Sequence, residues 1–83
     1  MKKTKEEKES YKRYQKFLEN WCMLMATKYC GKDVDINRTW VETAVGMGYN
    51  KKLAEYFADK SQYFIGGNRD MIFFKLLDYS RMA

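Results

Sequence analysis

Histidine and proline are absent from this 83-residue sequence, and it has only two cysteines. Without histidine, the commonest general base of enzymes is missing, and two thiols cannot complete the usual four-ligand Cys/His zinc sets. Cys22 and Cys30 would lie about 12 Å apart in the single helix that the pattern predicts, which is too far for a disulfide. We therefore expect no metal, no cofactor and a reducing, cytoplasmic location.

Long apolar runs and catalytic motifs are also missing. The longest apolar run, residues 21–26, is far shorter than the ~20 residues that span a bilayer. Polar residues follow the basic start of the chain, where an export signal would need apolar ones. The sequence has neither a nucleotide-binding glycine pattern nor a nucleophile motif. We expect a soluble protein with no membrane partner and no enzymatic activity.

The residues that are present favour helices. Hydrophobic residues make up 46% of the chain and aromatic residues 17%, which is enough for one core at this length. Without proline, only glycines interrupt helices, and they occur at position 31, at 46 and 48, and at 66 and 67. The sequence therefore predicts one all-α domain over residues 1–83, a small, compact four-helix domain with a long N-terminal helix. The expected helices cover roughly 4–30, 38–46, 51–65 and 69–81, with residues 1–4 frayed.

Capping residues mark the expected helix starts. Thr4 and Glu7 have the S/T-x-x-E spacing of a capping box, in which each side chain binds the backbone N–H of the other. Asn37, Asn50 and Asn68 each precede a basic residue and then a large apolar one, so we expect each to be the N-cap of its helix. The caps and the glycines thus predict the same four helices.

Positive charge is concentrated near the N-terminal end. The net charge is +5, and in a helix Lys5, Lys8, Lys12 and Lys16 fall within a sector of about 80°, away from the apolar stripe. Lysines four residues apart repel one another, and a row of phosphates or carboxylates would offset that repulsion. These lysines and Arg13 form the first candidate site. Its expected partner is an acidic macromolecule, DNA or RNA first and an acidic protein surface second.

A second candidate site lies within residues 44–57, which partly match a helix-turn-helix. A small residue precedes a glycine-containing turn, and the next helix starts with cations. In this interpretation Asn50, Lys51 and Lys52 face the groove of DNA. In the other interpretation the segment is an ordinary helical hairpin with these side chains in solvent.

The last expected helix is apolar around most of its circumference, so it is either central in the core or half buried in a partner. Phe73, Phe74 and Leu77 are accordingly candidates for a protein interface or a homodimer seam, with burial in the core as the alternative. Tyr49, Tyr63 and Tyr79 fall outside the main apolar stripes, and we expect them to be exposed.

Two functional hypotheses follow. The first is a small, basic helical regulator that binds nucleic acid or a nucleoprotein complex through the lysine-rich face of the first helix. The second is a stoichiometric protein-binding inhibitor or adaptor, of the kind that a phage directs against a host protein or defence complex. Affinity capture with and without nuclease would distinguish the two hypotheses, because only a directly bound protein partner remains after nuclease treatment.

Overall fold

Four α-helices make up most of the residues that the structure, a computed structural model, describes, which are 5–30, 32–64 and 66–82. Within these ranges there is no β-strand, and the prediction of an all-α fold is confirmed. Thr4, in the expected capping box of the first helix, and Gly31, the glycine expected to end it, lie outside the described ranges. The helices are α1 (Lys5–Leu24), α2 (Ile36–Gly46), α3 (Lys51–Ser61) and α4 (Arg69–Met82), and a π-helical segment, η1 (Met25–Tyr29), extends α1.

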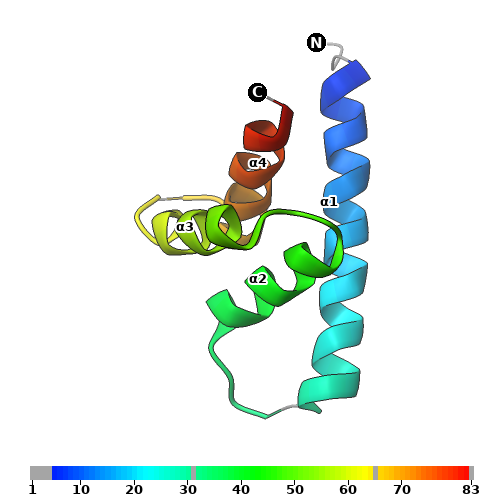
Figure 1. Ribbon diagram of the computed structural model, residues 1–83, viewed down its shortest axis with the longest axis vertical. Coiled ribbons are helices and arrows are strands. Elements are labelled where there is room, and N and C mark those ends of the chain that lie inside the picture. The colour runs from blue at the N-terminus through cyan, green and yellow to red at the C-terminus, as the bar shows by residue number, and fades with distance from the viewer. Residues whose placement is uncertain (1–4, 31, 65, 83) are drawn as a thin grey trace.

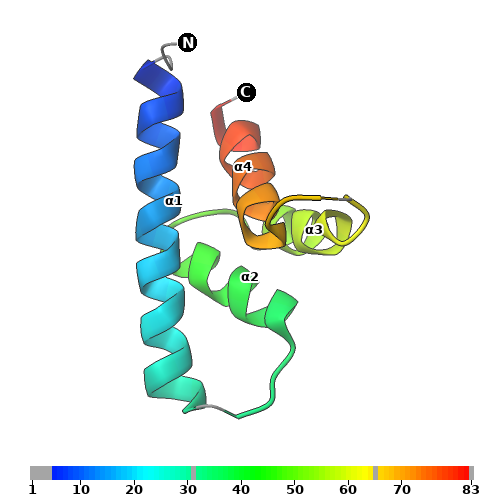
Figure 2. The same ribbon diagram turned by 180° about the vertical axis from the view of Figure 1, so that it is seen from behind.

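The three shorter helices all lie on one side of α1. Together, α1 and η1 run along the longest dimension of the molecule, which measures 41 × 24 × 24 Å (Figure 1). Figure 2 shows the same one-sided arrangement from behind. α2 and α4 pack against α1, whereas α3 packs on α2 and α4 at the far side of the molecule. One face of α1 is therefore covered, and the opposite face is open to solvent.

The first helix changes geometry near its end. The Cys30 N–H donates to the Met25 carbonyl oxygen at 2.8 Å, five residues back, which is the hydrogen bond of a π-helix. Cys30 has a φ of 47°, and this left-handed conformation ends the helix. Lys28 and Tyr29 donate to the two carboxylate oxygens of Glu42, each at 2.8 Å. These bonds fix the end of the long helix to α2.

The start of α2 differs from the prediction. The helix begins at Ile36 and its N-cap is Asp35, whose carboxylate accepts from the Asn37 backbone N–H at 3.0 Å. A carboxylate here also interacts favourably with the positive end of the helix dipole. The prediction that Asn37 is the cap is therefore wrong. Its side-chain oxygen instead accepts from Arg69 Nη2 at 2.6 Å, which links α2 to α4.

A short turn over residues 47–50 connects α2 to α3. Gly48 has a φ of 96° there, a conformation that residues with a side chain rarely adopt. The Asn50 side-chain oxygen accepts from the Leu53 backbone N–H at 3.0 Å, so its predicted N-cap role is confirmed. α2 and α3 thus form a helical hairpin with a short, glycine-containing connection.

The third helix is shorter than predicted. It ends at Ser61 rather than near residue 65, because the Gln62 and Tyr63 N–H groups donate to carbonyl oxygens three residues back, in tighter turns. α4 then begins at the predicted residue. As a result, Tyr63 and Phe64 lie beyond the end of α3, on exposed chain.

Aromatic side chains from α1, α2 and α4 form the centre of the core. Phe17 stacks on Phe74 with ring centroids 5.1 Å apart, and Trp40 stacks on Phe73 at 5.7 Å. Phe73 and Phe74 are 0% exposed and Leu77 is 1% exposed. These three side chains therefore fill the core, and assigning them to a protein interface or a dimer seam is wrong. The physical reason is that α4 packs against both α1 and α3.

The fully buried residues of α3 are small. Ala54, Ala58 and Ser61 face the core and let α3 approach its neighbours closely. Arg69 of α4 closes this contact: its guanidinium donates to the Ala58 carbonyl oxygen at 3.1 Å and to Ser61 Oγ. The same guanidinium lies 4.9 Å from the centroid of the Trp40 ring. α3 is thus held by a compact contact, to which the half-buried Phe57 adds, whereas the large side chains of Leu53 and Tyr56 stay exposed.

Candidate nucleic-acid interface

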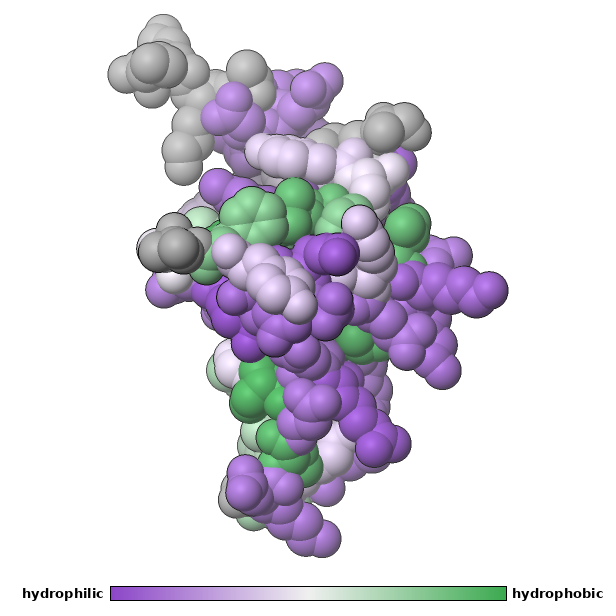
Figure 3. Space-filling view, turned by 90° about the vertical axis from the view of Figure 1, so that its left-hand side faces the viewer, coloured by the Kyte–Doolittle hydropathy of each residue, from purple (hydrophilic) through white to green (hydrophobic). Residues whose placement is uncertain are grey.

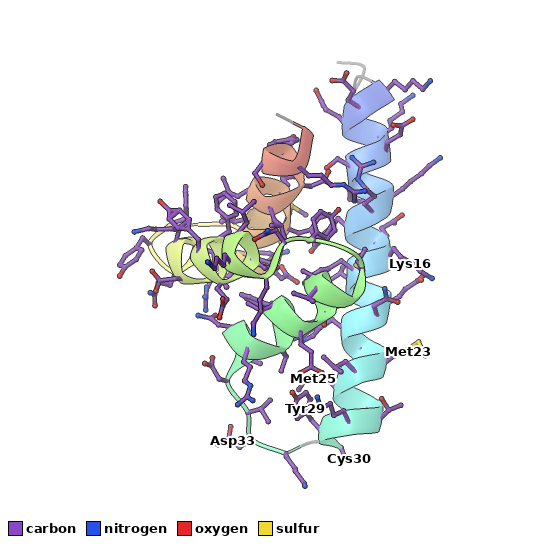
Figure 4. All side chains as sticks on the ribbon, viewed as in Figure 1. Lys16, Met23, Met25, Tyr29, Cys30 and Asp33 are labelled. Carbon is purple, nitrogen blue, oxygen red and sulfur yellow. The ribbon has the colours of Figure 1, made fainter. Side chains whose placement is uncertain are left out.

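Four lysines lie on the face of α1 opposite the core. Tyr14 and Phe17 are buried on the inner face, and at 100° per residue Lys8 lies about 180° around the helix from Phe17. Figure 4 shows Lys16 pointing away from the other helices. We call this surface the lysine ridge. It consists of Lys5, Lys8, Lys12 and Lys16, which are all exposed.

Two carboxylates, those of Glu9 and Glu19, lie beside the ridge and offset its charge only weakly. Lys16 Nζ lies 3.9 Å from a Glu19 carboxylate oxygen, with both side chains at least 65% exposed, where an ion pair contributes little. The exposed Glu9 borders the ridge without forming a salt bridge to it, and no salt bridge within the described ranges involves the other three lysines. The ridge is therefore a solvated row of cations about 16 Å long.

Arg13, the remaining cation assigned to this site, belongs to a buried network. Its Nε–H and Nη2–H groups donate to the two carboxylate oxygens of Asp78, each at 2.8 Å. Asp78 has a fully buried side chain and also accepts from the Tyr49 hydroxyl at 2.7 Å. Burial alone would raise the pKa of Asp78, but hydrogen bonds from Arg13, Tyr49 and Ser10 hold it below its usual value. Arg13 thus joins α1 to α4, which corrects its assignment to the binding face.

The structure also corrects one of the tyrosine predictions. Tyr49 is 6% exposed, and its ring packs edge-on against Phe74 with centroids 5.4 Å apart. Burial, and then the hydrogen bond to Asp78, raises the pKa of Tyr49 to about 12. Tyr63 and Tyr79 are 69% and 47% exposed, as expected from the sequence.

The second predicted site, at the start of α3, is exposed but mixed in charge. Asn50, Lys51 and Lys52 all reach solvent, although the Asn50 oxygen is occupied by its capping bond. Lys51 and Arg38 line an open groove of about 560 Å³ between α2 and α3. Four carboxylates line the same groove, which therefore does not favour phosphate. They belong to Asp35, Glu42, Glu55 and Asp59.

The two predicted binding sites do not form one surface. The lysine ridge faces outward from α1, and α3 lies on the other side of the molecule (Figures 1 and 2). A duplex lying along the ridge would be separated by the body of the domain from Asn50, Lys51 and Lys52. The arrangement therefore gives no support to joint contact of one duplex by both sites, and the ridge is the stronger candidate.

An exposed, largely apolar surface that was not among the predicted binding sites lies along α3 and the chain just after it. Leu53, Tyr56, Tyr63 and Phe64 are 41%, 51%, 69% and 51% exposed. Lys60 lies among them, with Nζ 5.4 Å from the Tyr56 ring centroid and 5.8 Å from that of Tyr63. We call these five residues the α3 stripe. Figure 3, which views the side of the molecule where α3 lies, shows hydrophobic side chains exposed among more polar ones on this face.

No protein-family model, no curated protein and no solved structure matches this chain. Among the described residues, no helix is both long and apolar enough to cross a membrane. In the same ranges, no group of three or more His, Cys, Asp or Glu side chains is placed to hold a metal ion.

Proposed function

We propose that the protein is a small, basic, non-enzymatic regulator that binds nucleic acid, free or in a nucleoprotein complex, through the lysine ridge. The position of the ridge carries this proposal: four exposed lysines lie in a row on the face of α1 opposite the core. Such a row can contact phosphates and release their condensed counterions, which favours binding without any reading of sequence.

The composition of the ridge favours nucleic acid over a folded acidic protein. The four lysines have only polar or charged side chains between them on the outer face of α1, whereas the buried centre of a protein interface is mostly apolar. The inhibitor or adaptor alternative loses one of its two expected surfaces, because Phe73, Phe74 and Leu77 are inside the fold, and keeps only the lysine ridge. The exposed Cys22 and Cys30 form no disulfide, which fits a cytoplasmic protein.

Titration of a labelled DNA duplex at several salt concentrations tests the proposal. If all four lysines contact phosphates, the slope of log K against log salt lies between about −3 and −4. Affinity then falls about 100-fold between about 50 and about 200 mM salt. Removing two contacts with the double variant Lys8→Gln, Lys12→Gln makes the slope shallower by about 2.

A matched variant controls for net charge. Lys32→Gln with Lys75→Gln removes the same charge from exposed positions outside the ridge, and it should change the slope by less than about 0.5. Equal losses of affinity in the two double variants would contradict the proposal. So would competition by polyglutamate as strong as that by an oligonucleotide of equal charge, or a failure of both DNA and RNA to bind at low salt.

A further inference from the structure

The α3 stripe is a largely apolar surface, on α3 and the chain just after it, that the rest of the described chain leaves open. A buried aromatic side chain covers about 150–250 Å², so the exposed parts of the stripe amount to about 400 Å². That is about half of the ~800 Å² that each partner contributes to a standard interface. Exposed apolar patches of this size often mark an interaction site. The charges around the stripe indicate which partner fits it.

The charges beside the stripe are self-complementary. Lys52 and Asp59 are seven residues apart and differ by only about 20° in position around α3, so they lie on the same edge of the stripe. When two identical helices pack antiparallel about a two-fold axis, like edges face each other. Lys52 of each copy then lies opposite Asp59 of the other. A nucleic-acid strand, in contrast, would bring its phosphates close to the Asp59 carboxylate.

We infer that a second copy of this chain covers the α3 stripe in an antiparallel, two-fold pairing of α3 with α3. Leu53 and Tyr56 of the two copies lie nearest the two-fold axis, Tyr63 and Phe64 lie toward the two ends of the contact, and the two pairs of Lys52 with Asp59 close one edge. The dimer seam is thus on α3 instead of α4. Because the stripe and the lysine ridge lie on opposite sides of the fold, the pairing leaves both ridges exposed and is independent of nucleic-acid binding.

Sedimentation equilibrium of the full chain without nucleic acid tests the pairing. Between about 10 µM and about 1 mM, the wild type should change from monomer to dimer, with a midpoint near about 100 µM. Lys52→Glu or Asp59→Lys alone places like charges opposite each other in both pairs and should weaken association about tenfold. The double variant restores opposite charges and should return to within about threefold of the wild type.

Two further variants sharpen the test. Tyr56→Glu places a charge in the centre of the stripe and should prevent dimerisation, while circular dichroism shows that the exposed substitution leaves the fold intact. The ridge variant Lys8→Gln, Lys12→Gln should dimerise like the wild type, so loss of nucleic-acid binding and loss of dimerisation are distinguishable.

The inference is overturned if the wild type stays monomeric over the whole range, if Tyr56→Glu still dimerises, or if the double charge swap does not recover association. A monomer whose Tyr56 and Tyr63 NMR signals shift on adding a single-stranded oligonucleotide would assign the stripe to nucleic acid instead.

Discussion

α3 and α4 both carry large apolar side chains, but they use them in opposite ways. Phe73 and Phe74 of α4 are 0% exposed, whereas Leu53 and Tyr56 of α3 are 41% and 51% exposed. α4 packs against both α1 and α3, while α3 meets its neighbours through small residues such as Ala58. Because α3 also packs against two helices, α2 and α4, the difference shows that the face on which a helix carries its large side chains decides which of them are buried.

The largest effect is expected from a cavity in the core, next to the buried face of α4. Phe73→Ala should lower the free energy of unfolding by about 4 kcal/mol, because the removed ring is fully buried between Phe17 and Trp40. Urea unfolding at a concentration well below that of dimer formation measures the change. A loss smaller than about 1 kcal/mol would mean that α4 is not the central helix of the core.

The next largest effect should come from the network that joins α4 to α1. Arg13→Met leaves the Asp78 carboxylate buried without its cation and should lower the free energy of unfolding by about 3 kcal/mol. The exposed Arg38 is a matched control, since Arg38→Met should change stability by less than about 0.5 kcal/mol. A similar loss of unfolding free energy in both variants would show that the ion pair of Arg13 with Asp78 adds no more stability than an exposed arginine does.

The pH dependence of the same variant follows from the lowered pKa of Asp78. A carboxyl group with a folded-state pKa below its unfolded value, about 3.9, contributes stability above that value and loses it as pH falls through the folded-state pKa. The difference in stability between the wild type and Arg13→Met should therefore narrow below about pH 4. Urea unfolding at several pH values measures it, and a difference that widens in acid would contradict the assignment.

The smallest effect on stability is expected from an exposed aromatic residue just after α3. Phe64→Ala removes the same ring as Phe73→Ala but from a position that is 51% exposed, and it should change the stability of the monomer by less than about 0.5 kcal/mol. A loss above about 2 kcal/mol in dilute solution would show that this side chain is covered within a single chain.

Some helix caps and helix ends could be predicted from the sequence, and the predictions that were wrong have a physical cause. The Asn50 cap was predictable because a side-chain oxygen and a nearby N–H group decide it. The prediction of an Asn37 cap was wrong because Asp35, two residues earlier, is an equally good cap residue. The Asn37 side chain binds Arg69 of α4 instead. The end of α3 was misplaced because the tighter turns that stop it have no proline or glycine at that point.

The candidate sites were predictable to different degrees. The lysine ridge follows from helical spacing alone. Each residue turns the helix by about 100°, so residues that share one face of a helix do so in any fold. The pairing of Arg13 with Asp78 was not predictable, since it joins residues 65 positions apart. The exposure of the α3 stripe was not predictable either. The three- and four-residue spacing of Leu53, Tyr56 and Lys60 is equally typical of a helix face that packs in the core.

The sequence by itself thus determined that this chain is helical, basic and built with a row of lysines on its longest helix. Those properties depend on residue type and on spacing within one helix. Only the tertiary structure decided that Arg13 is held by Asp78, that Phe73, Phe74 and Leu77 are buried, and that the larger side chains of α3 are not. Those properties depend on which helices pack together, because each helix buries only the face that its neighbours cover.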